Sequence, residues 1–344
     1  MTVKVGFVGC GARAQREWLD LVRMPNVQFA GLCDVSEEAV RGSLDRFNRE
    51  RPPAEQLAAP LFTDVRRMLD AVDLDAVYVA LPPFAHGEIE HAVIDAGKAI
   101  LVEKPLAIDM GVARAIDAHI REAGVINSVG YQGRYGALVD RAREVLAGVP
   151  IGLVLAIRLG GLPPKLWWRI QEQSGGMLIE QHTHAVDLMR YLAGEVDSVY
   201  AAAGTLLLQE VPQLSIDDVN AATVQFSSGA VGTIVNTCAV AGRQLPNVSG
   251  YIHIVARNLV LAISPAALHI MRGREEPEVL RGELEDGNYK MNETFIRAVE
   301  TGDSSAIRSS YSDSLRTHAV TVGAVQSART GRPLRIADLL EGRS

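Results

Sequence analysis

The amino-acid sequence predicts an α/β domain built on a doubly wound parallel sheet, followed by an α+β domain. Short apolar segments alternate with helical patterns over the first 130 residues, and a glycine-rich turn follows the first of these segments. Alternation of this kind is typical of parallel strands joined by crossover helices. Later apolar segments follow one another with turn residues between them, which is typical of antiparallel strands. We therefore expect a second domain with an open-faced, mostly antiparallel sheet.

Composition narrows the class of protein further. The chain has 344 residues, 48% hydrophobic and 22% charged, with a net charge of -7. This length suits about two domains. A chain with net negative charge lacks the broad positive surface that would attract nucleic acid or an anionic membrane. Three cysteines without Cys-x-x-Cys spacing indicate a reducing compartment. The sequence shows no signal peptide and no long apolar run, so we expect a soluble cytoplasmic protein.

The first domain is expected over residues 1–130. Ser36, Asp64 and Asp109 stand where helix caps are needed, and a fourth helix ends at Gly97. The expected strands are Val3 to Val8, Val27 to Cys33, Leu61 to Thr63, Ala76 to Leu81, Ala99 to Val102 and Val125 to Tyr131.

The second domain is expected over residues 131–344, with the last helices able to pack back on the first domain. One helix, from about Met177 to Leu192, interrupts its strands. A sheet with few helices leaves a face uncovered, and such faces commonly meet a partner subunit. We expect a homodimer or homotetramer formed through this sheet. The expected strands are Leu153 to Leu159, Val199 to Gln209, Val219 to Phe226, Ala230 to Thr237, Tyr251 to Ala256 and Leu259 to Ile263.

A dinucleotide fingerprint lies between the first strand and the first helix. Gly9 permits a tight turn, Gly11 lets the backbone approach a pyrophosphate, and Ala14 allows the helix to pack closely on the sheet. The phosphates would meet N–H groups at the start of the helix, including those of Ala12 and Arg13. A simple turn without a ligand is the alternative interpretation.

Asp34 stands at the end of the second strand, 23 residues after Gly11. A carboxylate there suits a ribose 2′-hydroxyl and would repel a 2′-phosphate, which favours NAD over NADP as the cofactor. The alternative is that Asp34 only caps the next helix.

Four motifs in combination carry a resemblance. They are Gly9-x-Gly11-x-x-Ala14, Leu81-Pro82-Pro83-x-x-His86, Glu103-Lys104-Pro105 and Gly175-Gly176-x-x-x-Glu180-x-x-x-His184-x-x-Asp187. Together they resemble the Gfo/Idh/MocA family, the relatives of glucose-fructose oxidoreductase and inositol dehydrogenase, over nearly the whole chain. The resemblance implies an N-terminal Rossmann domain and NAD-dependent hydride transfer. The implied substrate is a sugar, cyclitol or sugar derivative, oxidised at a hydroxyl-bearing carbon.

The resemblance implies that Lys104 orients a substrate hydroxyl and that His184 is the general acid/base. An imidazole titrates in the range that suits removal of a hydroxyl proton, and a nearby ammonium stabilises a developing alkoxide. Glu180, His184 and Asp187 follow helical spacing, so we expect them on one face of a helix. A divalent metal on these three side chains is an alternative, although the family chemistry needs none.

The chain departs from the family pattern at two positions. Relatives usually have aspartate where this chain has Glu180, which shifts the reach of the carboxylate. His182 stands where a small residue is common, and it either faces the site or packs on another face of the helix. Both residues are expected substrate contacts, and Glu180 is also expected to be a catalytic residue beside Lys104 and His184.

Further substrate and cofactor contacts are expected from residue type and position. Trp167, Trp168 and Arg169 offer apolar aromatic surface beside a guanidinium, which suits a sugar ring or an anionic substituent. Arg158, Lys165 and Arg243 are further basic side chains that suit an acidic sugar, although isolated basic residues are common. Arg134 is a further expected substrate contact. The remaining expected cofactor contacts are Leu81, Pro82, His86, Glu103, Lys104 and Gln132.

Two other functions compete with a dehydrogenase. One is a glycoside hydrolase that uses NAD for transient oxidation, elimination and re-reduction. Glu180 and His182 motivate it, because elimination needs an additional acid/base group. The other is a non-enzymatic NAD-binding sensor, which the same fold would support.

Overall fold

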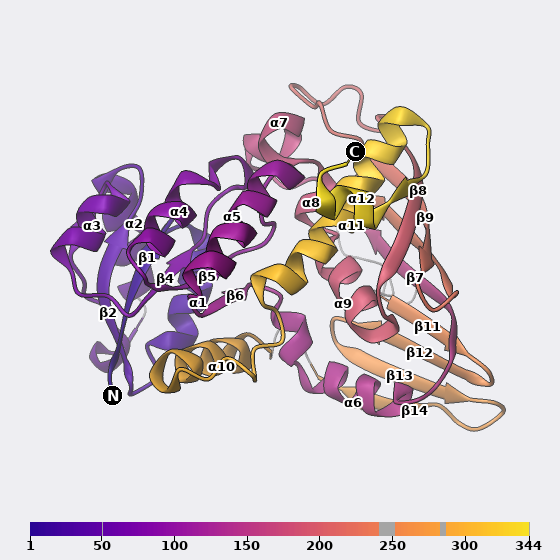
Figure 1. The fold of residues 1–344 in the computed structure, drawn as a ribbon, viewed down its shortest axis with the longest axis horizontal. Coiled ribbons are helices and arrows are strands. Elements are labelled where there is room, and N and C mark those ends of the chain that lie inside the picture. The colour runs from indigo at the N-terminus through magenta and orange to yellow at the C-terminus, as the bar shows by residue number, and fades with distance from the viewer. Residues whose placement is uncertain (50, 241–251, 283–286, 344) are drawn as a thin grey trace. The chain divides into compact units, whose positions relative to one another are not determined.

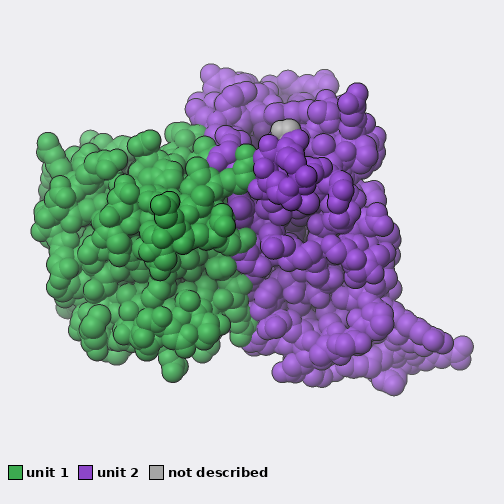
Figure 2. Space-filling model, viewed as in Figure 1, with its two compact units in different colours: residues 1–106, 112–130, 288–312 green, residues 107–111, 131–287, 313–344 purple. Residues whose placement is uncertain are grey.

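The computed structural model describes residues 1–49, 51–240, 252–282 and 287–343, which form two compact units. Unit 1 consists of Met1–Leu106, Val112–Gly130 and Asn288–Ser312, and unit 2 consists of Ala107–Gly111, Tyr131–Gly287 and Asp313–Ser344 (Figure 2).

Unit 1 is built on a six-stranded parallel sheet with the order β3-β2-β1-β4-β5-β6 (Figure 1). This is the doubly wound order of dinucleotide-binding domains, so the predicted fold class is confirmed. The fourth and sixth strands are shorter than predicted. The strands are β1 (Val3–Val8), β2 (Val27–Cys33), β3 (Leu61–Phe62), β4 (Ala76–Val79), β5 (Ala99–Val102) and β6 (Asn127–Val129).

Predicted caps begin two helices of unit 1. The Ser36 hydroxyl accepts a hydrogen bond from Ala39 N, and the Asp64 carboxylate accepts one from Arg67 N. The helices are α1 (Ala12–Leu21), α2 (Glu37–Asn48), α3 (Val65–Ala71), α4 (Glu88–Asp95), α5 (Met110–Ala123) and α10 (Gly287–Thr301), of which α5 and α10 lie mostly in this unit.

Unit 2 is built on a nine-stranded sheet with the order β14-β13-β12-β11-β7-β10-β9-β8-β15. Its described strand pairs are antiparallel except for β7 and β10, which run parallel. The strands are β7 (Ile151–Leu159), β8 (Val196–Gly204), β9 (Val219–Phe226), β10 (Val231–Thr237), β11 (Ile252–Ala256), β12 (Leu259–Ser264), β13 (Ala267–Arg272), β14 (Glu278–Arg281) and β15 (Leu334–Arg335). Tyr251, the predicted start of β11, lies outside the described residues.

Strand β8 ends at Gly204, so the prediction that it continues to Gln209 is wrong. The buried Asp218 carboxylate accepts hydrogen bonds from the backbone N–H groups of Leu206, Leu207 and Leu208 at 2.6–3.0 Å. These N–H groups are therefore unavailable to a strand ladder, and the segment forms a loop.

The predicted helix from Met177 to Leu192 is two helices, α8 (Met177–Glu180) and α9 (Thr183–Ala193). Between them, Gln181 N and His182 N both donate to Met177 O at 3.0 Å. A bond to the fifth preceding residue widens the turn and changes the direction of the helix. Glu180 therefore does not share one regular helical face with His184 and Asp187, which corrects that prediction. The other helices of unit 2 are α6 (Ala137–Leu146), α7 (Gln171–Ser174), α11 (Tyr311–Thr330) and α12 (Ile336–Glu341).

Burial alternates along the strands of unit 2. On β10, Ile234 is 1% exposed while Val231 is 48% exposed. One face of the sheet is thus covered by helices that include α9, and the other is open. No helix among the described residues has the length and apolarity needed to cross a bilayer.

Candidate active site

The fingerprint turn requires glycine at position 9. Gly9 has φ +85°, and a Cβ there would lie 2.3 Å from Ala80 O. Gly11, the N-cap of α1, has open space where its Cβ would be. Helical N–H groups are therefore approachable from this side, and the residues present fit a dinucleotide pyrophosphate.

Asp34 is fixed beside the fingerprint turn. Its Oδ2 accepts a hydrogen bond from Cys10 N at 2.8 Å, and its Oδ1 accepts one from Val35 N at 2.7 Å. Helix α2 is capped by Ser36, so the alternative interpretation of Asp34 as the helix cap does not hold. Its carboxylate stands at the carboxyl end of β2, where an acidic residue suits the ribose hydroxyls of a bound dinucleotide.

The Arg13 side chain is held by two carboxylates. Its Nε lies 2.8 Å from Glu103 Oε1, and its Nη2 lies 2.5 Å from Glu17 Oε1. Glu103 is 3% exposed and packs against Gly130, where a Cβ would lie 2.5 Å from its Oε2. The Arg13 guanidinium and the Glu103 carboxylate are thus engaged with each other, next to the half-buried Lys104.

The buried Glu17 carboxyl has an unusual proton affinity. Burial raises its pKa to about 7, against the opposing charge of Arg13. Asn292 Nδ2 donates to its Oε2 at 2.6 Å.

His86 is buried and oriented by a carboxylate. Its Nδ1 lies 2.5 Å from Glu90 Oε1, and Gly87 N donates to Glu90 Oε2 at 2.7 Å. Its Nε2 is buried and has no hydrogen-bond partner among the described residues. Leu81 packs near Gly9, and Pro82 is the N-cap of the short 3-10 helix (Pro83–Ala85) that precedes His86.

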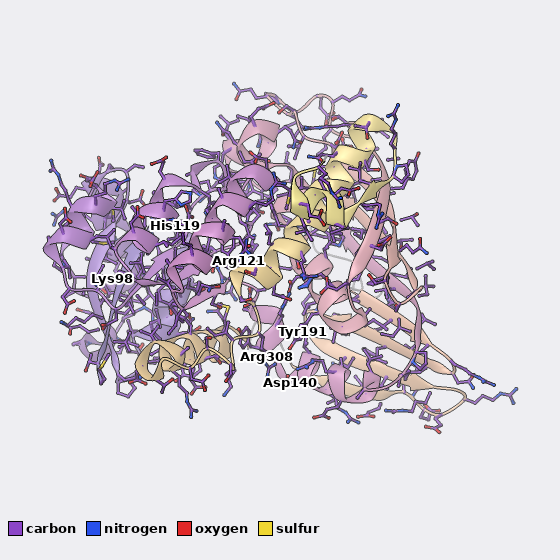
Figure 3. The ribbon with its side chains drawn as sticks, in the orientation of Figure 1. Lys98, His119, Arg121, Asp140, Tyr191 and Arg308 are labelled. Atoms are coloured by element: carbon purple, nitrogen blue, oxygen red, sulfur yellow. The ribbon has the colours of Figure 1, made fainter. Side chains whose placement is uncertain are left out.

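His184 lies in the first turn of α9 in unit 2 and is half-buried. The ring of Tyr131 meets the imidazole edge-on, with 6.0 Å between the ring centroids. The Tyr131 hydroxyl also forms a buried hydrogen bond of 2.8 Å with Thr183 Oγ1. One side chain therefore contacts His184 and anchors the residue before it. Tyr191, near the end of α9, is labelled in Figure 3.

Arg134 is an internal ion-pair partner, which corrects its prediction as a substrate contact. It is 1% exposed, donates from Nε and Nη2 to both oxygens of Asp187 at 2.8 and 2.5 Å, and also pairs with Asp313. Burial disfavours the charged form, but the two carboxylates raise the pKa of Arg134 further above its usual range. Asp187 also accepts from Thr317 Oγ1. Its oxygens are therefore engaged within unit 2, which removes it from the alternative metal site.

Glu180, Gln181 and Arg158 form a chain of hydrogen bonds at the break between α8 and α9. Glu180, which is 5% exposed, accepts at Oε2 from Gln181 Nε2 at 2.7 Å. Gln181 Oε1 in turn accepts from Arg158 Nη2 at 3.0 Å. Sequence reasoning missed Gln181, because its position depends on the break between α8 and α9, which helical periodicity does not reveal.

His182 is fully buried, and neither ring nitrogen has a hydrogen-bond partner among the described residues. Burial, helped by the charge of Arg158, lowers its pKa to about 3. The imidazole is thus neutral at physiological pH.

The remaining predicted contacts of unit 2 lie in two 3-10 turns. Trp167 and Trp168 stack with 4.7 Å between ring centroids, and Trp168 packs on a small core that includes Met177. Arg169 Nε and Gln132 Oε1 are buried without a hydrogen-bond partner in the described part of the chain. Arg243 lies outside the described residues.

Two family models match the chain. One, described as an oxidoreductase family with an NAD-binding Rossmann fold, matches residues 3–131. The other, the GFO/IDH/MocA C-terminal domain, matches residues 139–256. The chain belongs to the Gfo/Idh/MocA family. It is therefore an NAD-dependent oxidoreductase, as the resemblance implied.

Two curated members of the Gfo/Idh/MocA family illustrate its range. Myo-inositol 2-dehydrogenase of Thermotoga maritima is 24% identical over 240 residues, 68% of each chain. Levoglucosan dehydrogenase of Pseudarthrobacter phenanthrenivorans is 29% identical over 277 residues, 70% of this chain and 69% of that one. A solved levoglucosan dehydrogenase in complex with NADH shares the fold with a TM-score of 0.84 at 20% identity, over 98% of this chain and 99% of that one.

Proposed function

We propose that this protein is a dehydrogenase that transfers hydride between nicotinamide and a hydroxyl-bearing carbon of a sugar, cyclitol or sugar derivative. The observation that carries the proposal is the environment of His184, which is half-buried at the start of α9 and held by Tyr131 and Thr183. The names of the two curated relatives, one for a cyclitol and one for an anhydrosugar, support the substrate class.

The cofactor would be held mainly by unit 1. Gly9, Gly11 and the N–H groups of Ala12, Arg13 and Ala14 would take the pyrophosphate, and Asp34 the adenosine ribose. The Arg13 guanidinium stays with Glu103 and Glu17. When bound, NAD accepts or returns the hydride. Additional proposed contacts are Leu81, Pro82, His86, Lys104 and Gln132, whereas Glu103 supports the loop that carries Lys104.

Proton transfer would fall to Lys104 and His184. The His184 imidazole takes the proton of the substrate hydroxyl, and the Lys104 ammonium orients that hydroxyl and stabilises the negative charge that develops on it. Glu180 would accept a hydrogen bond from a second hydroxyl. Trp167 and Trp168 would offer apolar surface to the sugar ring, beside Arg169.

The test is NADH formation with a panel of sugars and cyclitols. Lys104→Ala and His184→Ala should each lower kcat by about 100-fold or more, the usual contribution of general acid–base catalysis. Lys290→Ala and His269→Ala alter exposed residues and serve as matched controls. Unchanged kcat in both active-site variants would contradict the assignment of proton transfer to Lys104 and His184.

The hydrolase alternative loses one of the two residues that motivate it. His182 is buried with a pKa of about 3, so it does not supply the additional acid that elimination needs. Release of an aglycone from a glycoside without stoichiometric NADH would nevertheless restore that function.

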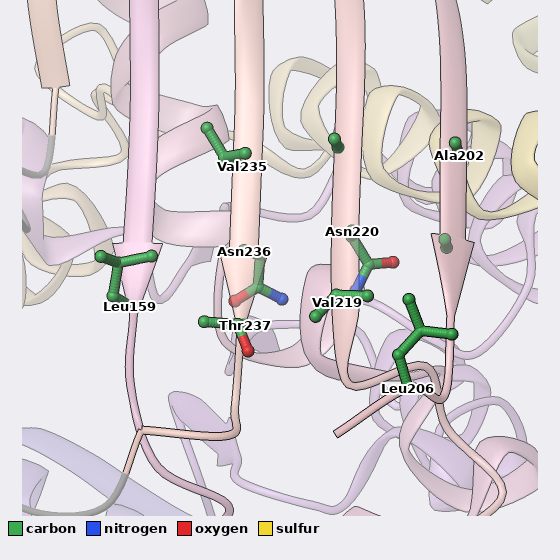
Figure 4. Close-up of a pocket in the computed structure, with 10 residues that line it drawn as sticks. Leu159, Ala202, Leu206, Val219, Asn220, Val235, Asn236 and Thr237 are labelled. Carbon is green, nitrogen blue, oxygen red and sulfur yellow. The ribbon is translucent and has the colours of Figure 1, made fainter. Parts of the chain in front are cut away.

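We also propose a homodimer or homotetramer joined through the open face of the unit 2 sheet. A groove of about 420 Å³ on this face is lined mainly by apolar side chains, among them Leu159, Leu206, Val219 and Val235 (Figure 4). Leu206 and Leu207 are 65% and 59% exposed. Exposed apolar surface of this kind commonly marks a protein interface.

Two further proposals concern the domain limits of the chain and its cellular location. We propose that unit 1 is the cofactor domain and unit 2 the substrate domain. This keeps the expected boundary near residue 130, but residues 288–312 belong to unit 1 and residues 107–111 to unit 2. All three cysteines are free and buried, which suits a cytoplasmic protein.

A further inference from the structure

A polar group lies on the covered face of the unit 2 sheet. Arg158 of β7 and Asn236 of β10 are register partners across the parallel pair. Each follows a buried residue two positions earlier, Ala156 and Ile234 respectively, so alternation places both on the covered face. Helix α8 packs on β10 and α9 on β7, so the group lies beneath the break between these helices.

Neighbouring residues hold the guanidinium of Arg158 in one position. Its Nη2 donates to Gln181 Oε1 at 3.0 Å. A Cβ on Gly160 would lie 2.6 Å from its Nη1, so a side chain at position 160 would displace the guanidinium. The backbone of Gly160 is itself fixed by a hydrogen bond of 3.0 Å from its N–H to Thr237 O.

Two neighbours of Arg158 are buried polar side chains without partners. Asn236 is 3% exposed, and neither its Nδ2 nor its Oδ1 has a hydrogen-bond partner among the described residues. His182 is fully buried, and neither of its ring nitrogens has a hydrogen-bond partner among the described residues. Proteins rarely leave such groups unsatisfied, and a bound ligand is one reason to keep them.

The donors and acceptors of this group indicate the ligand. A guanidinium only donates, and its planar fork matches a carboxylate. Asn236 Nδ2 and the N–H of a neutral His182 add uncharged donors, while Asn236 Oδ1 can accept from a hydroxyl on a neighbouring carbon. A neutral polyol would offer the guanidinium only weaker acceptors, because charge-assisted hydrogen bonds are the stronger kind.

We propose that Arg158, Gln181, His182 and Asn236 form a carboxylate subsite, so that the substrate is a sugar acid. Gln181 lies between Arg158 and Glu180 and is hydrogen-bonded to both. The ligand carboxylate therefore meets Arg158, and a hydroxyl of the ligand meets Glu180. The inference rests on the proposed function and names its substrate class.

The test is calorimetric titration of the NADH-loaded protein with matched ligands. D-Glucuronate, D-galacturonate and D-gluconate are each compared with the neutral parents D-glucose, D-galactose and D-glucitol. At least one acid should bind about 10-fold or more tightly than its parent. Arg158→Gln should weaken acid binding by about 10- to 100-fold, the range of a charged hydrogen bond, and change binding of the neutral parent by less than about 3-fold. Arg158→Lys should retain part of the preference for the acid.

Gly160→Ala tests the position of the Arg158 guanidinium without removing its positive charge. It should weaken acid binding because the new methyl group displaces the guanidinium. Gly152→Ala on β7 is the matched control, since its Cβ would meet only Val255 O at 3.8 Å. Thermal unfolding of each variant verifies that it is folded.

Two results would overturn the subsite: no preference for any acid over its parent in the wild type, or equal loss for acid and parent in Arg158→Gln. A wild type that binds acids selectively but forms no NADH with any panel member would contradict the proposed function and leave the subsite standing.

Discussion

Asp34 links cofactor choice to a single carboxylate. Its oxygens accept from Cys10 N and Val35 N, which holds the charge at the end of β2. Asp34→Ala should weaken NAD binding by about 10-fold and raise the NADP to NAD affinity ratio, because the repulsion of a 2′-phosphate is removed. Fluorescence titration with both dinucleotides measures this, and exposed Asp45→Ala on α2 is the control. Tighter binding of NADP than NAD by the wild type would contradict the assignment.

Glu17 should make stability depend on pH. Its pKa is about 7 in the folded protein and ordinarily 4.5, so the folded state binds the extra proton between these values. The stability from that proton is present at low pH and is lost as pH rises from about 4.5 to 7, by up to about 3 kcal/mol. Chemical unfolding at pH 5 and 8 should show this decrease in the wild type.

Glu17→Gln has no proton to lose, so its unfolding free energy should fall less over the same pH range. Glu37→Gln, at an exposed residue of α2, should behave as the wild type. A decrease of equal size in Glu17→Gln and the wild type would refute the linkage.

The local order of strand, turn and helix along the chain predicts the fingerprint turn, and the positive φ of Gly9 agrees with it. The cofactor contacts of Gly9, Gly11 and Asp34 stay predictions. Arg134 was misassigned because its role depends on Asp187 and Asp313, which are far away in sequence. Charge alone does not distinguish a buried ion pair from a substrate contact.

At the scale of elements, α9 depends on its anchors. Tyr131→Phe leaves the Thr183 hydroxyl buried without its partner, which should cost about 1–3 kcal/mol of unfolding free energy. It should also lower kcat more than it changes KM, because His184 follows Thr183 directly. Unfolding curves and steady-state kinetics measure the two effects.

Thr183→Val combined with Tyr131→Phe removes both hydroxyls, so the double variant should lose less stability than the sum of the single variants. Tyr200→Phe, at a half-exposed tyrosine of β8, is the control. Additive losses would mean that the hydroxyls do not act on each other.

The break between α8 and α9 shows the limit of periodicity. Apolar spacing from Met177 to Leu192 is that of one helix, yet His182 N bonds to Met177 O and the helix is interrupted. Nothing in the local pattern marks the break. It decides which side chains meet, since it brings Gln181 between Glu180 and Arg158.

At the scale of the whole molecule, the open sheet face should govern assembly. The loop that carries Leu206 and Leu207 is held by Asp218, so both leucines are presented from an ordered backbone. Leu206→Asp would place a charge against the partner and should shift the protein toward monomer. Sedimentation velocity measures the change, with Val35→Asp on unit 1 as the control. An unchanged oligomer in Leu206→Asp would exclude this part of the face from the interface.

The sequence by itself determined the fold class, the family, the cofactor and the fingerprint, because each depends on short-range order along the chain: strand, glycine turn, helix and acidic residue. Only the tertiary structure decided the roles of Arg134, Asp187, Gln181, His182 and Asn236. Their hydrogen bonds and burial come from elements that are distant in sequence, and burial determines whether a polar side chain pairs internally, stays neutral or awaits a ligand.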